Sequence, residues 1–302
     1  MSILVRRSNL VVHIDDSAAV NSAWRHNADA ITLNLDGTDV AGRAGVREAI
    51  ANVGQGAAEV FVKVSPEDLR ADCEAAIWPG LRGVMLDGVD SAAKVNAAEE
   101  IVTALERERG LPKNSLQLIL VIGSATGVWD VRAIVKASPR VSQVFIDEVA
   151  LAADLDITPL PELDPFDYAR GRVIVEAIAA KVMPVGIAYP LSVYMDGASA
   201  ADIQTLATKG KNLGFKGVMC PEPSWVAPAN AAYTPTPELV HYNKRVREAF
   251  AAGVAAGTAA VPLDGRMIDV PVDEWAIVVL DTAQACATRD AEKAAALATR
   301  SK

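Results

Sequence analysis

The chain has 302 residues, of which 51% are hydrophobic and only 5% aromatic, so its core must consist mainly of Ala, Val, Ile and Leu. This composition is typical of parallel strands packed against helices and argues against an aromatic-rich β-sandwich. A net charge of −9 without a basic stripe argues against nucleic acid and anionic membrane as partners.

Eight short apolar segments alternate with helical segments along the chain. The predicted strands are Asn9–Ile14, Ala30–Asp36, Glu59–Val64, Gly83–Gly88, Leu116–Gly123, Val141–Asp147, Met183–Tyr189 and Gly214–Cys220. Most are near-continuous aliphatic strings, which indicates strands buried on both faces. This alternation predicts an α/β fold of the (β/α)8 TIM barrel type. A doubly wound sheet is the competing arrangement, and the number of strands favours the barrel.

Helix-start signals separate these strands. Ser65-Pro66-Glu67-Asp68 places a cap, a first-turn proline and two acidic residues before Leu69. Ser91 opens a long Ala-rich helix, and Ser199 with Asp202 predicts a capping box.

A tail follows the eighth strand. Thr234-Pro235-Thr236-Pro237 opens a helix to about Ala256, a turn is expected at Asp264-Gly265, and a final helix begins near Val272. We expect one structural domain, with the barrel over residues 1–230. A C-terminal helical extension over residues 231–302 is expected to pack on the barrel or on a neighbouring subunit.

The cysteines and apolar runs bear on the cellular compartment. Cys73, Cys220 and Cys286 lie far apart, without metal or redox spacing, which indicates a reducing environment. The longest apolar run, Leu116 to Ile122, is too short to cross a bilayer, and the N-terminus does not resemble a signal peptide. We therefore expect a cytoplasmic protein that does not bind membranes.

Polar residues at the carboxyl ends of the predicted strands are the candidate site residues, because a barrel carries its active site there. They form an acidic rim with one lysine: His13, Asp15, Asp16, Asn34, Asp36, Lys63, Ser65, Asp87, Asp90, Ser124, Asp147, Glu148, Tyr189, Cys220 and Glu222. Aspartate and serine after a strand are also common helix caps, which is the competing interpretation for Asp15, Asp16 and Ser124. For His13, a hydrogen-bonded rim histidine is favoured over a metal ligand or a base.

Lys63 stands out because it lies between Val62 and Val64. A cation that faces inward from such a strand needs a carboxylate or an anionic ligand. A catalytic role and a structural salt bridge to Asp36 are both open. A Schiff base would require a lowered pKa, for which the sequence gives no indication.

Several strings of the sequence resemble those of one enzyme family. RRSNLVV (6–12) resembles RRSLLFVPG, and ADAITLNLD (28–36) resembles ADAVILDLED. SATGVWDVRAIVKASPRVSQVF (124–145) follows ETARGVLNAAEIAAASPRVAALVF. GFKGVMCPEPSWVAPANAAYTPTPE (214–238) resembles GFDGKWCIHPDQIAPVNEAFTPTPE, and LDGRMIDVP (263–271) resembles DGKMIDAP. These strings resemble the citrate lyase β-subunit family of HpcH/HpaI aldolases, which includes malyl-CoA and citramalyl-CoA lyases.

The resemblance implies a Mg2+-dependent barrel that cleaves or forms a carbon–carbon bond between an acyl-CoA and an oxo acid. The family's two metal-binding carboxylates correspond here to Gly123 and Ala150. Lys63 corresponds to the arginine that grips the oxo acid, and Asp90 to a fourth-strand glutamate. Asp269 matches an aspartate that the family presents from a neighbouring subunit, in a homotrimer or hexamer. The chain therefore resembles a divergent member without the usual Mg2+ ligands.

Two hypotheses from different classes follow. The first is a divergent carbon–carbon lyase of aldolase or Claisen type, or a thioester hydrolase. It would act on a CoA ester or a small oxo or hydroxy acid, with Lys63, Asp269 and Asp36 as catalytic candidates. The second is a catalytically silent barrel that binds a related ligand or serves as a subunit of an assembly.

Further roles complete the hypothesis of an enzyme. The candidates for substrate binding are Arg6 and Arg7, which could bind CoA phosphates, together with Ser124 and Asp90. Mg2+ is the cofactor that the resemblance implies. A relocated metal site would draw on Asp147 and Glu148, with Asp36, Asp87 or His13 as further acids or ligands.

Overall fold

The computed structural model describes residues 3–158, 163–187 and 198–300. Two compact units can be distinguished: one contains Arg6–Tyr233 and the other contains Thr234–Ala298. No helix in these described ranges has the length and apolar character needed to cross a membrane.

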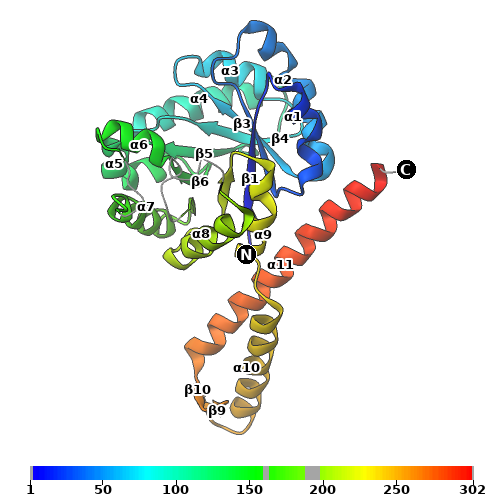
Figure 1. Ribbon diagram of the computed structural model, residues 1–302, viewed down its shortest axis with the longest axis vertical. Helices are drawn as coiled ribbons and strands as arrows, with labels where there is room; N and C mark the ends of the chain where they lie inside the picture. The colour runs from blue at the N-terminus through cyan, green and yellow to red at the C-terminus, as the bar shows by residue number, and fades with distance from the viewer. Residues whose placement is uncertain (1–2, 159–162, 188–197, 301–302) are drawn as a thin grey trace. The chain divides into compact units, whose positions relative to one another are not determined.

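The first unit is a parallel barrel with helices around it (Figure 1), as the alternation of apolar and helical segments predicted. Its strands are β1 Ser8–His13, β2 Ala30–Asn34, β3 Glu59–Val64, β4 Leu81–Leu86, β5 Gln117–Ile122, β6 Val141–Ile146, β7 Met183–Val185 and β8 Val218–Cys220. Their order in the sheet is β7-β6-β5-β4-β3-β2-β1-β8. Backbone hydrogen bonds from Lys216 to Pro184 (2.9 Å) and from Gly186 to Gly217 (3.1 Å) join the two end strands. The predicted seventh strand extends further, to Tyr189, which lies outside the described residues.

The helices of this unit alternate with the strands. They are α1 Ser17–Ser22, α2 Val40–Val53, α3 Leu69–Ala76, α4 Ala92–Glu108, α5 Ala125–Val135, α6 Glu148–Asp154, α7 Asp167–Ala179, α8 Ala200–Leu213 and α9 Val226–Tyr233. The predicted capping box of Ser199 and Asp202 is present at the start of α8. α3 begins only at Leu69, because the N–H of Ser65 donates to the Asp72 carboxylate (2.8 Å) and holds this segment outside the helix.

The core has two parts. A large cluster of aliphatic side chains fills the layer between strands and helices. A second, smaller cluster lines the barrel interior and includes Ala30, Phe61, Met85, Ile119, Val121, Val185 and Met219. Because the strands are apolar on both faces, polar groups are concentrated at the two ends of the barrel.

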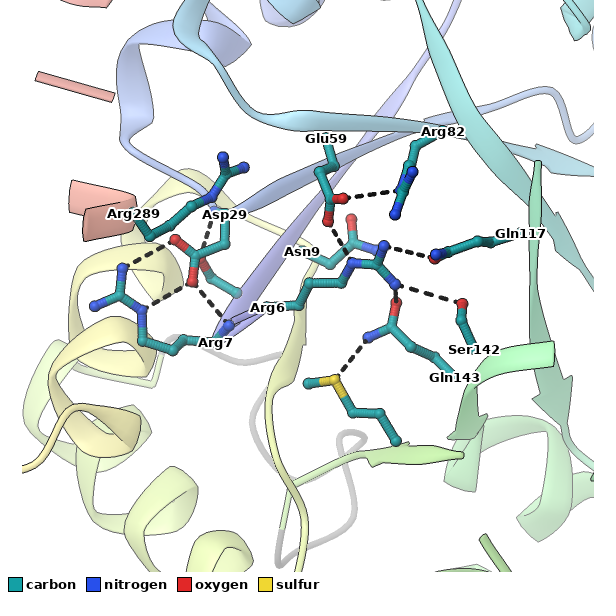
Figure 2. Close-up of polar contacts among 12 residues, drawn as sticks. Arg6, Arg7, Asn9, Asp29, Glu59, Arg82, Gln117, Ser142, Gln143 and Arg289 are labelled. Atoms are coloured by element: carbon teal, nitrogen blue, oxygen red, sulfur yellow. Dashed lines mark hydrogen bonds and ion pairs between the residues drawn. The ribbon is translucent and has the colours of Figure 1, made fainter. Parts of the chain in front are cut away.

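A buried polar network closes the amino end of the barrel (Figure 2). The Arg6 guanidinium donates to Glu59 (2.5 Å), to Gln117 Oε1 (2.6 Å) and to Gln143 Oε1 (3.2 Å). It also lies 4.8 Å from the ring centroid of Phe61. Several charge-assisted hydrogen bonds therefore compensate for the removal of this guanidinium from water.

The second unit is the C-terminal helical extension. It contains α10 Pro237–Ala255, a hairpin of β9 Val261–Leu263 and β10 Arg266–Ile268, and α11 Val270–Arg300. Asp264 (φ 50°) and Gly265 (φ 76°) form the hairpin turn at the predicted position. Aspartate and glycine are common at turn positions that require positive φ.

Candidate functional site

A cavity of about 490 Å3 lies at the carboxyl ends of the strands, where a barrel enzyme carries its active site. It is lined by Val11, His13, Asn34, Lys63, Met85, Val121, Phe145, Asp147, Val149, Ala198, Met219, Pro221, Glu222 and Trp225. Its lining combines apolar side chains with a few polar ones. This combination is typical of a small-molecule site.

Lys63 is the cation of this cavity. Its ammonium lies 2.5 Å from Asp36 Oδ2 and 2.6 Å from Asp87 Oδ2, so the expected salt bridge to Asp36 is present and Asp87 adds a second one. Burial alone would lower the pKa of Lys63, but the hydrogen bonds to Asp36 and Asp87 outweigh it, and the pKa is raised. A raised pKa keeps the amine protonated, which disfavours a Schiff base. An ammonium has three N–H donors, so after these two carboxylates one is left without a partner among the described residues.

Asp147 and Glu148 are neighbours in sequence but lie in different environments. Asp147 caps α6, and its Oδ1 accepts hydrogen bonds from the N–H groups of Val149 and Ala150, each at 3.0 Å. Glu148 is buried and accepts two hydrogen bonds from Arg170, at 2.5 and 2.7 Å. Asp147 lines the cavity whereas Glu148 does not, so the structure does not bring this pair together.

His13 uses both of its ring nitrogens for contacts with the backbone. Its Nε2–H donates to the Asp36 carbonyl (2.8 Å), and its Nδ1 accepts from the N–H of Asp15 (3.3 Å). These bonds fix the orientation of the ring at the cavity wall. This agrees with the interpretation of His13 as a hydrogen-bonded rim residue.

The residues present do not fit a divalent metal. Gly123 and Ala150, the positions at which the resemblance led us to expect metal-binding carboxylates, supply no donor oxygen from their side chains. They are also close together: a Cβ atom added at Gly123 would lie only 2.7 Å from the Cβ of Ala150. Asp36 and Asp87 are bound to Lys63, and no group of three or more His, Cys, Asp or Glu side chains in the described ranges could hold a metal ion.

The structure does not bring the predicted substrate arginines to the cavity. Arg6 and Arg7 precede β1 and therefore lie at the amino end of the barrel, opposite the cavity. Both are buried, Arg6 in the network described above and Arg7 in an ion pair with Asp29 (2.8 Å). Their position before a strand was the signal that could have placed them there.

Four other predicted residues also do not line the cavity: Asp36, which is bound to Lys63, and the three described next. Asp90 forms an ion pair with Lys94 (2.8 Å) at the start of α4, and Ser124 caps α5 by accepting from the N–H of Gly127 (3.1 Å). Asp269 lies in the second unit, where its Oδ1 accepts from the N–H of Val272 (3.3 Å) at the start of α11.

The apolar residues that line the cavity were not predicted from the sequence, because only polar residues at strand ends were taken as candidates. Met85 and Phe145 lie two residues before Asp87 and Asp147, so they point to the same side of their strands. This period-two pattern could have identified them. Trp225 follows the eighth strand in a short turn, and no pattern in the sequence indicated its position at the cavity.

Comparisons with known proteins agree on one family. The model of the HpcH/HpaI aldolase/citrate lyase family matches residues 7–223. The chain is 28% identical over 294 residues to the citrate lyase subunit beta of Escherichia coli strain K12, covering 94% of this chain and 95% of that protein. It is 24% identical over 285 residues to the L-malyl-CoA/beta-methylmalyl-CoA lyase of Cereibacter sphaeroides, covering 85% and 88%.

Solved structures give the same fold. A citrate lyase from Burkholderia xenovorans has a TM-score of 0.76 at 15% identity, covering 96% of each chain. The protein CitE from Mycobacterium tuberculosis, in complex with magnesium, acetoacetate and coenzyme A, has a TM-score of 0.67 at 22% identity. It covers 92% of this chain and 97% of its own. At such low identity these similarities establish the barrel fold alone.

Proposed function

The chain belongs to the HpcH/HpaI aldolase/citrate lyase family, and we propose that it is a carbon–carbon lyase in which the Lys63 ammonium takes over the electrostatic role of a divalent metal. The observation that carries this proposal is the position of Lys63 in the cavity wall, between Asp36 and Asp87 and with one N–H donor left. The proposed substrate is a hydroxyacyl-CoA ester, which is cleaved to an acyl-CoA and an oxo acid. The names of the relatives, citrate lyase subunit beta and malyl-CoA lyase, support this substrate class.

The physical case rests on where negative charge develops. Cleavage of the carbon–carbon bond leaves an enolate, whose oxygen needs a positive partner that is already in place. Asp36 and Asp87 hold the Lys63 ammonium at the cavity and keep it protonated, and its side chain is only 17% exposed. One such oriented donor typically accelerates a reaction by about 10²–10³-fold.

The test is cleavage of malyl-CoA and citramalyl-CoA by the full-length protein after EDTA treatment, with and without added Mg2+. We expect cleavage that does not depend on Mg2+, and a loss of about 100-fold or more in kcat for Lys63→Met. Lys94→Met is the matched control, because Lys94 also pairs with an aspartate but does not line this cavity. Activity that appears only with Mg2+ would contradict the proposed role of Lys63.

A free hydroxy acid, smaller than a CoA ester, is an alternative substrate for the proposed lyase. Arg6 and Arg7 are committed to buried networks at the amino end, so they do not support binding of CoA phosphates. Free malate and citramalate therefore belong in the same assay. A thioester hydrolase would be recognised by release of free CoA together with the intact hydroxy acid.

The second candidate function is a catalytically silent barrel that binds a related ligand. The resemblance supports it, because Gly123 and Ala150 stand at the positions that it matches to the family's two metal-binding carboxylates. Isothermal titration with a CoA ester and with a short oxo acid separates the two candidates. Binding without turnover of any substrate in the panel would favour the silent barrel.

The oligomeric state is a prediction from the resemblance, whereas the single structural domain with its C-terminal extension is a prediction from the sequence pattern. A homotrimer or hexamer would place Asp269 of one chain at the barrel mouth of another, as the C-terminal extension does in the family. Light scattering on the purified protein tests this arrangement. A monomer in solution would remove the role proposed for Asp269.

A further inference from the structure

We infer that Asp147, rather than Asp269 of a neighbouring chain, is the residue that transfers the proton in this reaction, so that both charged groups needed for cleavage come from one barrel. The inference rests on the proposed function.

The geometry of Asp147 supports this role. It follows β6, whereas Lys63 lies on β3, and both side chains line the same cavity. Two N–H groups at the start of α6 bind one oxygen of Asp147, which fixes the carboxylate in place. Within the part of the chain that the structure describes, no hydrogen bond to its other oxygen, Oδ2, is present. A proton-transfer group needs this combination of a held side chain and an open acceptor atom.

The other titratable side chains of the cavity are less suited to accept a proton. His13 uses both ring nitrogens for backbone contacts. Lys63 is held in its protonated form by its two aspartates. Glu222 lies exposed in the loop after β8, and among the described residues a single hydrogen bond, from Ser224 (3.2 Å), orients its carboxylate.

The reaction balances with these two residues and a 3-hydroxyacyl thioester. The Asp147 carboxylate takes the proton of the substrate hydroxyl, and the carbon–oxygen bond becomes a carbonyl. The bond between the carbinol carbon and the α-carbon breaks, and its electron pair forms the thioester enolate, whose oxygen faces the Lys63 ammonium. Asp147 then returns the proton to the α-carbon, which yields an oxo acid and an acyl thioester without net oxidation or reduction.

The variant Asp147→Asn tests this step with little disturbance of the fold. Asparagine is as good an N-cap as aspartate, so α6 should stay capped while the proton acceptor is lost. Asp39→Asn is the matched control, because Asp39 caps α2 by the same kind of bond, to the N–H of Gly42 (2.9 Å), and does not line the cavity. Thermal unfolding of both variants checks that the fold is retained.

The readouts are cleavage of malyl-CoA and citramalyl-CoA and exchange of the α-hydrogens of acetyl-CoA in deuterated water. Asp147→Asn should lose about 100-fold or more in kcat and in exchange, with KM little changed, and the acid limb of the wild-type pH–rate profile should disappear. Asp39→Asn should keep the wild-type rates.

Two negative outcomes are distinguishable. An active wild type whose Asp147→Asn variant stays within threefold of it would overturn the role of Asp147 and leave the proposed lyase intact. A well-folded wild type that neither cleaves these esters nor exchanges the α-hydrogens would overturn the proposed function and this inference together. If Asp147→Asn does not fold, the pH–rate profile of Asp147→Glu decides, because a displaced carboxylate should lower kcat and shift the acid limb.

Discussion

Charged side chains are bound differently at the two ends of the barrel. At the amino end, Arg6 and Arg7 are buried and bound to carboxylates and amides, and the network fills the end of the barrel. At the carboxyl end, hydrogen bonds and ion pairs within the protein orient Lys63 and Asp147, and both side chains line the cavity. Among the described residues, one N–H of Lys63 and one oxygen of Asp147 have no partner.

This difference separates stability from function in one fold. A charge whose hydrogen bonds are all made within the protein stabilises the fold but has no capacity left for a ligand. A charge that is oriented yet incompletely bonded can act on one. In barrels generally, the amino end contributes to stability and the carboxyl end carries the chemistry. The following predictions test this division, beginning with the largest expected effect.

Replacing Arg6 should disturb the amino end most. Arg6→Met leaves Glu59, Gln117 and Gln143 without their shared donor, and breaking a buried pair typically costs about 3–5 kcal/mol of unfolding free energy. Arg82→Met is the control, since Arg82 is 3.0 Å from the other oxygen of Glu59 but is 43% exposed, and should cost less than about 1 kcal/mol. Denaturant unfolding measures both; equal losses would contradict the distinction between buried and exposed partners.

Acid should weaken the amino end through Glu106. Burial alone would raise the pKa of Glu106, but hydrogen bonds from Arg140 and from the N–H groups of Leu116 and Asn114 outweigh it and lower the pKa. A lowered folded pKa means that the stabilisation is complete above about pH 4.3, the ordinary value, and is lost as pH falls through the folded value.

Glu106→Gln should therefore lower the unfolding free energy by about 1.5–3 kcal/mol at pH 7, the usual worth of a hydrogen bond to a charged group. The difference from wild type should shrink as the pH falls below about 4.3. Urea unfolding of wild type and Glu106→Gln from pH 7 to pH 3 measures this difference. A difference that stays constant over this range would show that the carboxylate charge is not what stabilises this end.

At the carboxyl end, adding one methyl group at Gly123 should be costly. The new Cβ would lie 2.7 Å from the Cβ of Ala150, so the backbone must shift, and overpacking typically costs about 1–3 kcal/mol. Gly171→Ala, in the interior of α7, meets no atom within 4 Å and should stabilise by about 0.5–1 kcal/mol. Thermal unfolding of the two variants should thus shift in opposite directions; a neutral Gly123→Ala would mean that there is room for a side chain.

The smallest effect is expected for the Lys63 ion pairs in alkali. Because the pKa of Lys63 is raised, their stabilisation is complete below about pH 10.4, the ordinary value, and is lost as pH rises through the folded value. Asp36 and Asp87 are partly exposed, so the stabilisation should stay below about 1 kcal/mol. The unfolding free energies of wild type and Lys63→Met, measured between pH 8 and 12, should converge at the alkaline end. If they diverge, the direction of the pKa shift of Lys63 is wrong.

The sequence specified the barrel because its signal is repeated. Eight apolar segments with helix starts between them give the same answer at every repeat, and the bounds of Glu59–Val64 are those of β3. The site depends on single side chains, for which no repetition exists. Lys63 can be predicted as a site residue because a lysine between valines needs a partner, and Asp36 is the partner that the sequence predicts.

Other site residues could not be placed in the same way. Asp147 and Glu148 have similar chemistry in sequence, and only the position of Arg170 on a later helix decides that Glu148 is buried and Asp147 faces the cavity. The second carboxylate of Lys63, Asp87, depends on how the loop after β4 approaches β3. Such choices are made by tertiary packing rather than by local pattern.

The contact between Gly123 and Ala150 also constrains the order of evolutionary steps. A lineage that acquired a carboxylate at position 123 would first have to find space for its Cβ, which Ala150 occupies. Any substitution at 123 therefore costs stability at once, whatever function the new side chain could serve. The small side chains that meet here therefore make position 123 difficult to change by one mutation at a time.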